Sequence, residues 1–392
     1  MKNLRSRGVN CSGECMNKYQ IYADHAATTK LDSDALAEMN AFLQEDYGNP
    51  SALYSKSKNP RKAIEEARRI IAEQIGSFSN EIYFTSCGTE SDNWAIKGAA
   101  YNYIGEKKRI ITSCIEHHAV LYSCASLEKI GFDVVYLPVD KKGRISAAEL
   151  EAVITQNTIL ISIMMANNEI GTIQAIKELA AIAHKHNVMF HTDAVQAIGH
   201  IPVDVHLLDV DMLSASAHKF NGPKGTGFLY IKKGVEIENL LSGGGQENRY
   251  RAGTENVAGI VGMAYALKKN SGLMDQDAEY LRSLEKYFWD TMKKSGLEYI
   301  SNGADWRIPG SISVSIKDAS GEMILHRLDL MGIAVSTGSA CNSQETELSH
   351  VLKAIAIPEE YALGTIRITL GIDNTIEDLD KIVEGIIKIL NR

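Results

Sequence analysis

The sequence has few cysteines and prolines, no excess of positive charge and no long apolar run. Its 392 residues include 6 cysteines and 7 prolines, and no apolar run approaches the ~20 residues of a transmembrane helix. The 41 Lys and Arg residues are outnumbered by 49 Asp and Glu residues, which gives a net charge of -8. Nucleic-acid-binding proteins usually carry a basic face. We therefore expect neither a nucleic-acid partner nor a membrane partner.

The first 18 residues are predicted to be an N-terminal extension. The start of the chain carries basic residues but lacks the apolar core of a secretory signal peptide, so we expect a cytoplasmic protein. Six cysteines are too few for a disulfide scaffold in a chain of this length. Cys11 and Cys15 form the run CSGEC, and with no second cysteine pair they do not complete a zinc ligand set. We interpret them as incidental residues and expect no metal site.

The order of apolar runs predicts an α/β protein with a large doubly wound, mostly parallel sheet and a smaller α+β domain. Over residues 32–262, short continuous apolar runs alternate with amphipathic helices, which is typical of buried parallel strands. Residues 19–31 and 263–392 are assigned to the smaller domain. There GSISVSIK and TIRITLGI alternate like half-exposed strands, and TIEDLDKIVEGIIKILNR predicts a closing helix with a threonine cap.

Several polar residues fall where predicted strands end, which is where doubly wound sheets bind ligands. Lys219 in SASAHKF ends an apolar run, where its amine is either a strand-end cation or is held for covalent chemistry with a carbonyl compound. Asp193 ends VMFHTD and would need a cationic partner if buried, although an aspartate that caps the next helix is as common. His117 and His118 follow another strand. Asn167 and Asn168 follow a third.

Two further features concern an anion and a thiol. In TSCGTESDN, Gly88 and Thr89 lie where the start of a helix favours an anion such as phosphate. Cys341 lies in VSTGSACNSQ, a run of small residues that favours a reactive thiol over a core cysteine. Arg367 lies on the strand TIRITLG, where an arginine usually pairs with a carboxylate.

Taken together, these residues resemble the cysteine desulfurases of the NifS/IscS type. The resemblance rests on NNEIGTIQ, HTDAVQ, SASAHKFNGPKGTG, RAGTEN and STGSACNS, and it runs from IYADHAATT almost to the C-terminus. It implies a transferase of fold type I that depends on pyridoxal 5′-phosphate (PLP). It also answers the question that Lys219 raises, because in this family that lysine forms a Schiff base with PLP.

The resemblance assigns further roles residue by residue. Asp193 would pair with the pyridine nitrogen, which keeps the ring an electron sink. His117 would stack over the ring and shuttle protons, with His118 a bystander. Asn168 and Gln196 would contact the ring hydroxyl. The phosphate would be bound by Gly88, Thr89, Ser216 and His218, and in a homodimer also by Thr254 of the partner subunit. The substrate carboxylate would be bound by Arg367, Asn49 and Asn168.

The implied reaction converts L-cysteine to L-alanine. The Cys341 thiolate would take the substrate sulfur as a persulfide and pass it to an acceptor, such as a scaffold protein for iron–sulfur clusters. Four departures from the family pattern stand out. Cys87 replaces a small residue, and Asn248 and Arg249 replace an Arg-Gly pair. His25 replaces an asparagine, and Leu348 replaces a proline after the cysteine loop.

Other functions remain open from the residues alone. A selenocysteine lyase, another PLP-dependent C–S lyase or an aminotransferase of the same fold would share most of these residues, although an aminotransferase would not need Cys341. A catalytically silent binding protein would not need the intact Lys219. A metal site at His184, His186 and His191 is a weaker alternative. His184 and His186 lie at the end of a predicted helix, where the helix dipole stabilises histidines without any metal.

Overall fold

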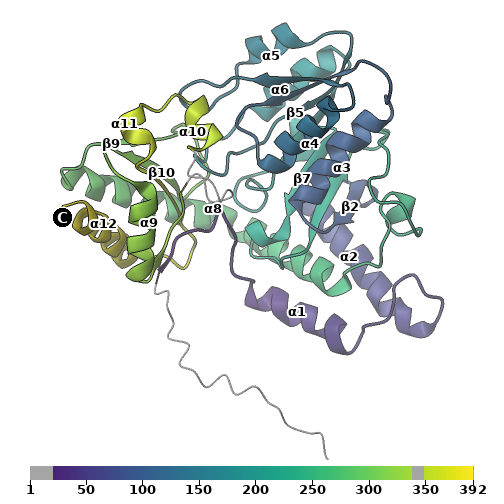
Figure 1. Cartoon of the computed structure of the whole chain (residues 1–392). Coiled ribbons are helices and arrows are strands. Elements are labelled where there is room, and N and C mark those ends of the chain that lie inside the picture. The colour runs from purple at the N-terminus through teal and green to yellow at the C-terminus, as the bar shows by residue number, and fades with distance from the viewer. Residues whose placement is uncertain (1–20, 338–347, 392) are drawn as a thin grey trace, which may run out of the picture.

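The computed structural model describes residues 21–337 and 348–391. Cys11, Cys15 and Cys341 lie outside the described residues. The described chain forms a large sheet covered by helices on both faces, with a smaller sheet at one end of the molecule (Figure 1).

The large sheet confirms the predicted α/β class. Every neighbouring pair of its strands is parallel except the two pairs that involve β8. Strands β5 and β7 are buried along their whole length, which explains why their sequences are almost continuously apolar or small. In spatial order the seven strands are β2 (Ile82–Thr85), β8 (Gly227–Ile231), β7 (Met212–Ser216), β6 (Met189–Asp193), β5 (Thr158–Ser162), β3 (Arg109–Ser113) and β4 (Asp133–Leu137).

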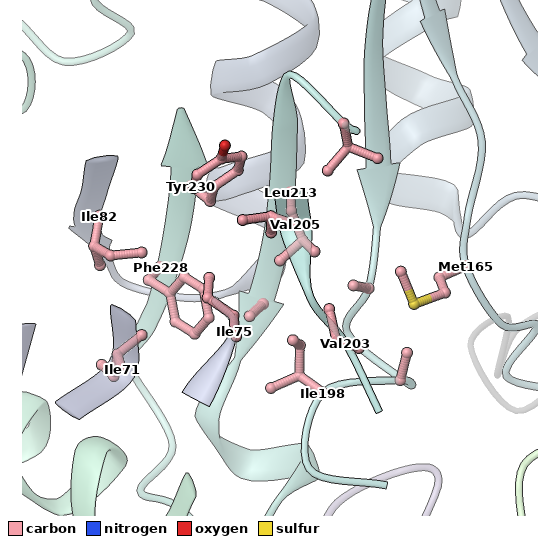
Figure 2. Packing of buried hydrophobic residues seen from close by; sticks show 14 of the residues in the cluster. Ile71, Ile75, Ile82, Met165, Ile198, Val203, Val205, Leu213, Phe228 and Tyr230 are labelled. Atoms are coloured by element: carbon pink, nitrogen blue, oxygen red, sulfur yellow. The ribbon is translucent and has the colours of Figure 1, made fainter. Parts of the chain in front are cut away.

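Helices pack against both faces of this sheet. On one face, Ile71 of α2 and Ile75, the residue directly after this helix, contact the apolar side chains of the sheet around Phe228 and Leu213 (Figure 2). On the other face, α3 and α4 contribute Trp94 and Val120 to a second apolar cluster. The helices of this part are α1 (Ser33–Gln44), α2 (Lys58–Gln74), α3 (Gly88–Tyr101), α4 (His118–Glu128), α5 (Ala147–Val153), α6 (Ile176–Lys185) and α7 (Val205–Leu208).

A long helix, α8 (Val257–Lys294), joins the two parts. Its first half, including Met263 and Leu267, belongs to the core of the large sheet, and its second half, including Leu284 and Phe288, belongs to the core of the small sheet. The predicted division between residues 262 and 263 therefore falls inside a continuous helix. The division itself stays a prediction.

The smaller part contains a three-stranded antiparallel sheet and the C-terminal helix. The helix begins as the sequence predicts: Thr375 accepts a hydrogen bond from the backbone N–H of Asp378, whose carboxylate accepts from the N–H of Thr375 in return. The elements are β1 (Ile21–Tyr22), β9 (Tyr299–Ser301), β10 (Ser311–Ile316), α9 (Gly321–Leu330), β11 (Ile333–Ala334), α10 (His350–Ala354), α11 (Glu359–Ala362), β12 (Thr365–Thr369) and α12 (Ile376–Leu390).

The prediction that β10 and β12 are half-exposed is wrong, because every residue of both strands is buried. The polar face of β10 is covered by side chains that satisfy it. Asn302 donates to Ser313 Oγ at 3.1 Å and to Ser315 Oγ at 2.8 Å. Ser315 also shares a hydrogen bond with Thr365 at 2.6 Å. Small hydroxyls can be buried when they are paired in this way.

The described helices have no membrane-spanning character. Among residues 21–337 and 348–391, no helix is both long and apolar enough to cross a bilayer.

Candidate active site

Strand ends of the large sheet bring the predicted polar residues to one edge. Asp193 is the last residue of β6, and Ser216 is the last residue of the neighbouring strand β7. Lys219 follows Ser216 in a single helical turn. His117 and Asn168 come shortly after β3 and β5. Because parallel strands end at the same edge of a sheet, this edge is where a ligand of the fold binds.

Asp193 is buried and close to a cation. Its Oδ1 accepts a hydrogen bond from the backbone N–H of Val195 at 2.9 Å. Burial raises the pKa of Asp193 to about 6, and the Val195 N–H and the Lys219 charge oppose this rise. A cationic ring nitrogen placed against the carboxylate would restore its charged state.

Lys219 is held by the segment Asp24–Thr29. Its Nζ donates to the carbonyl oxygens of Ala26 at 2.6 Å and Ala27 at 2.9 Å. Gln196 Nε2 donates to the same carbonyl of Ala26 at 3.0 Å. The amine therefore has a defined position beside Gln196. Lysine amines placed in this way are suited to react with carbonyl compounds.

His218 contacts the same segment. Its Nδ1 lies 3.1 Å from Thr28 Oγ1, and its backbone carbonyl accepts from the N–H of Thr29 at 2.8 Å. Burial, with smaller contributions from Lys219 and Lys224, lowers the pKa of His218 to about 4. The imidazole is therefore neutral at physiological pH.

The start of α3 forms a cradle for an anion. A Cβ added to Gly88 would lie 2.6 Å from Val195 Cγ2 and 3.4 Å from Ser216 Cβ, so only glycine fits between these residues. Ser216 is 1% exposed, and within the described part of the chain its Oγ has no hydrogen-bond partner. Buried hydroxyls are normally paired. The unpaired hydroxyl and the free N–H groups of a helix start are together suited to a phosphate. Thr89, on the first turn of α3, is exposed.

Thr254 lies close in sequence to Arg251, a residue that contacts the same helix start within one chain. It is exposed and lies three residues after Arg251. Arg251 donates to both carboxylate oxygens of Glu90 on the first turn of α3, at 2.7 and 3.0 Å. This pair neutralises the one acidic side chain at the helix start.

His117 caps the start of α4. Its Nδ1 accepts a hydrogen bond from the N–H of Ala119 at 3.1 Å. Burial, followed by the charges of Lys219 and His118, lowers the pKa of His117 to about 4. The ring is therefore neutral at physiological pH and carries its proton on Nε2. Its neighbour His118 instead stacks on Tyr122, with ring centroids 5.0 Å apart.

Arg367 is buried on β12 and has two partners. Its Nη2 donates to Asp24 Oδ1 at 2.7 Å, and its Nη1 donates to the carbonyl of Asn168 at 3.1 Å. The Nε is also buried, and no described residue accepts a hydrogen bond from it. It remains a donor for a carboxylate.

Asn168 and Gln196 line one small cavity of about 30 Å³, together with Ala26. The neighbouring Asn167 plays a structural part instead: its Nδ2 donates to the carbonyl of Ile115 at 2.9 Å, and its Oδ1 accepts from the N–H of Glu169.

Asn49 is not joined to this group by a described contact. It lies exposed on the loop after α1, where its side chain accepts from the N–H of Ser51 at 2.9 Å. Cys341, the predicted nucleophile, lies outside the described residues.

The three histidines of the alternative metal site have separate partners. His184 binds Asp209 and Asp211, and His186 binds Glu151. His191 is fully buried between Ser162 and Ser214. Groups of three or more His, Cys, Asp or Glu that could hold a metal ion do not occur among the described residues.

Sequence reasoning missed two contributors to the site. One is the segment Asp24–Thr29, which contacts Lys219 through backbone carbonyls. It contacts His218 through the Thr28 hydroxyl and the Thr29 N–H, and Arg367 through the Asp24 carboxylate. The other is Glu169, which is 6% exposed and lies next to Asn168. The run of small residues in DHAATT was the available signal for a close backbone approach to Lys219.

These residues fit PLP. The unpaired Ser216 hydroxyl and the cradle at Gly88 suit its phosphate, the buried Asp193 suits its ring nitrogen, and Lys219 Nζ suits its aldehyde. A large doubly wound sheet with this set of residues at its carboxyl edge defines a PLP-dependent enzyme of fold type I.

Comparison with known proteins identifies the family. Residues 21–382 match the model of the aminotransferase class-V family, so the chain belongs to this family and PLP is its cofactor. A cysteine desulfurase IscS of Dictyoglomus turgidum is 51% identical over 376 residues, which cover 96% of this chain and 95% of the relative.

Solved structures of similar proteins share this fold. A NifS-like protein superposes with a TM-score of 0.89 at 40% identity, over 95% of this chain and 99% of the other. A structure described as SspA in complex with cysteine gives a TM-score of 0.81 at 36% identity, over 90% of this chain and 99% of the other.

Proposed function

We propose that this enzyme is a cysteine desulfurase that converts L-cysteine to L-alanine and receives the sulfur as a persulfide on Cys341. One observation carries the proposal. Arg367, which has a donor left for a substrate carboxylate, pairs with Ser336 through two backbone hydrogen bonds of 2.7 and 3.0 Å. Ser336 precedes Cys341 by five residues. The pairing brings the start of the cysteine segment to the residue that would bind the substrate.

Some of the described residues would bind the cofactor and the substrate, and others would transfer protons. PLP, when bound, supplies an electron sink for negative charge at the substrate α-carbon. Asp193 would hold its ring nitrogen, Ser216 and the start of α3 its phosphate, and Asn168 and Gln196 its ring hydroxyl. Arg367 would bind the substrate carboxylate, with Asn49 and Asn168 assisting. Lys219 Nζ would move the proton of the α-carbon.

The neutral ring of His117 carries its hydrogen on Nε2 and can give up that proton only after it has gained another on Nδ1. It would lie beside the ring of PLP. A proton from Cys341 cannot go to Nδ1 without breaking the hydrogen bond from Ala119. We propose that His117 shuttles protons by taking one on Nδ1, with release of the Ala119 hydrogen bond, before it gives up the one on Nε2, because loss of the Nε2 proton first would leave an imidazolate.

The sulfur-transfer step balances without an oxidant. The Cys341 thiolate attacks the substrate sulfur, and a new S–S bond forms as the C–S bond breaks. The bonding electron pair stays with the substrate carbon, which takes up a proton. The products are alanine and the Cys341 persulfide.

We further propose a homodimeric, cytoplasmic enzyme, with Thr254 reaching the phosphate of the partner subunit. Large apolar side chains on α1 and the loop after it support a second copy as partner: Leu43 is 57% exposed, Tyr47 70% and Leu53 99%. The persulfide would pass to an acceptor such as an iron–sulfur scaffold protein.

The test compares the wild type with Cys341→Ala and Lys219→Ala. Purified protein is incubated with L-cysteine and a reductant, and alanine and sulfide are measured. The proposal requires equal amounts of both products from the wild type and none from either variant. Full turnover by Cys341→Ala would contradict it and favour an aminotransferase. Turnover of selenocysteine but not cysteine would favour a selenocysteine lyase.

A further inference from the structure

Both flanks of the segment that carries Cys341 are anchored at one short stretch of the large domain. Upstream, Ser336 pairs with Arg367, which donates to the carbonyl of Asn168. Downstream, Ser349 Oγ donates to Glu169 Oε2 at 2.5 Å. The two anchors therefore converge on consecutive residues, Asn168 and Glu169, although they are separated by 12 residues of sequence between Ser336 and Ser349.

Glu169 is fixed by its own turn. The side chain of Asn167 accepts from the N–H groups of Glu169 at 2.9 Å and Ile170 at 3.0 Å. The turn ends at Gly171, whose φ of +71° favours glycine. The carboxylate is buried, and Arg367 is the charged group that acts on it. A buried carboxylate held by one hydroxyl and one nearby guanidinium is sensitive to the loss of either.

Ser349 connects the carboxylate of Glu169 to α10. It is the N-cap of the helix and accepts from the N–H of Val351 at 3.1 Å. Val351 and Leu352 of α10 pack against Met164 and Ile170 of the large domain. The helix is thus held by an apolar contact, which tolerates small shifts, and by a directional hydrogen bond that sets its register.

The next residue adds a second directional contact. His350 Nε2 donates to the carbonyl of Glu116, the residue before His117, at 2.9 Å. The downstream flank of the cysteine segment is therefore tied to the large domain at two points: the side chain of Glu169, which follows Asn168, and the backbone carbonyl of Glu116, which precedes His117.

We infer that Glu169 is a positioning residue for sulfur transfer, acting through Ser349 on the segment that carries Cys341. The inference rests on the proposed function. It assigns Glu169 no contact with substrate or cofactor. Its loss would weaken delivery of the Cys341 thiolate while leaving the chemistry of Lys219 in place.

The test uses the PLP-loaded enzyme and three variants. Glu169→Ala and Ser349→Ala each remove the hydrogen bond, whereas Glu169→Gln keeps an oxygen that accepts from Ser349. Ser320→Ala is the matched control, because Ser320 caps α9 of the same domain and accepts from the N–H of Met323 within that helix.

Two rates separate positioning from general damage. Alanine formation from L-cysteine requires Cys341. Exchange of the α-hydrogen of L-alanine with solvent deuterium requires Lys219 but not Cys341. We expect Glu169→Ala and Ser349→Ala to lower the rate of alanine formation roughly tenfold. The exchange rate and the KM for L-cysteine stay within about twofold in both, and Glu169→Gln and Ser320→Ala stay near wild type.

Amide hydrogen exchange gives a readout that does not depend on turnover. Backbone amides of residues 350–355 should exchange faster in Glu169→Ala and Ser349→Ala than in the wild type, and not in Ser320→Ala. If Glu169→Ala does not fold, Ser349→Ala carries the test.

The outcomes distinguish the two proposals. A wild type that forms no alanine would overturn the proposed function and this inference with it. A working wild type with unchanged rates in both Ala variants would overturn the inference alone. Equal losses in alanine formation and α-hydrogen exchange would also overturn it, because they would show a general structural role.

Discussion

Arg367 and Asp24, 343 positions apart in the sequence, are joined by a hydrogen bond of 2.7 Å between Nη2 and Oδ1. The bond connects the small sheet to the segment whose carbonyls hold Lys219. It also fixes the guanidinium so that one buried donor, Nε, is left over. The residue proposed to bind the substrate and the residue proposed to bind the cofactor are therefore positioned by one hexapeptide, Asp24–Thr29.

Arg367→Lys is expected to raise the KM for L-cysteine by about tenfold to a hundredfold. A lysine ammonium cannot hold Asp24, the carbonyl of Asn168 and a carboxylate in the fixed directions of a guanidinium. Arg307→Lys is the control, because Arg307 is also buried in this domain but binds the carbonyls of Ala304 and Asn302. Steady-state kinetics of both variants check the prediction. An Arg367→Lys enzyme with wild-type KM would show that the carboxylate binds elsewhere.

Ser216→Ala is expected to stabilise the cofactor-free protein by about 1 kcal/mol, because it removes a buried hydroxyl without a described partner. The same change should weaken PLP binding by roughly tenfold. Thermal unfolding of the cofactor-free protein and titration with PLP measure the two effects.

Ser214→Ala, on the same strand, is the control for this pair of effects. Its hydroxyl is paired with His191 at 2.9 Å, so its removal should destabilise the cofactor-free protein. Ser216→Ala protein that is less stable than wild type without PLP would refute the assignment of its hydroxyl to the phosphate.

Arg249→Gly is expected to stabilise the protein by about 1 kcal/mol. Arg249 has a φ of +72°, and Glu247 and Asn248 before it also have positive φ values, of 46° and 56°. Glycine adopts this conformation without the steric cost of a Cβ. Arg249→Ala keeps the Cβ and should give no gain, so denaturant unfolding of the two variants separates relief of backbone strain from loss of the side chain. Equal stability of the two would contradict the explanation.

His191→Gln is expected to make the protein less sensitive to acid. Burial lowers the pKa of His191 to about 3. Between this value and about 6.5, the unfolded state binds a proton that the folded state does not, so stability is present above pH 6.5 and falls as the pH falls. The stability advantage of the wild type over His191→Gln should shrink by up to about 2 kcal/mol between pH 7 and pH 5.

Denaturant unfolding of both proteins at the two pH values measures this difference. Glutamine does not titrate in this range, so carboxylates that titrate in both proteins cancel in the comparison. A difference in stability that is constant with pH would mean that His191 is protonated in the folded state or is not buried.

The sequence predicts the fold well because the fold depends on patterns that side chains carry. Continuous apolar runs such as NTILIS predict buried parallel strands, and Thr375 with Asp378 marks the start of the last helix. The burial of β10 could not be predicted from its serines, which suggest an exposed face. Their hydroxyls accept hydrogen bonds from Asn302, which lies in the connection between β9 and β10.

The residues of the site can be predicted from the sequence, but the contacts between them cannot. Asp193, Ser216 and Lys219 follow apolar runs, so their place at a strand end can be inferred. The small residues of DHAATT indicate a close backbone approach, but the sequence does not tell which carbonyls bind Lys219, because every residue has a carbonyl. Glu169 was also missed, since its role depends on Ser349, which approaches it only in the folded chain.

The most direct test of the account is to locate the sulfur after a single turnover. The PLP-loaded enzyme is mixed with less than one equivalent of L-cysteine without reductant, its thiols and persulfides are blocked, and its peptides are analysed by mass spectrometry. The account predicts one added sulfur atom on the peptide that contains Cys341, in an amount equal to the alanine formed. Added sulfur on the Cys87 peptide, or alanine without added sulfur on Cys341, would contradict it.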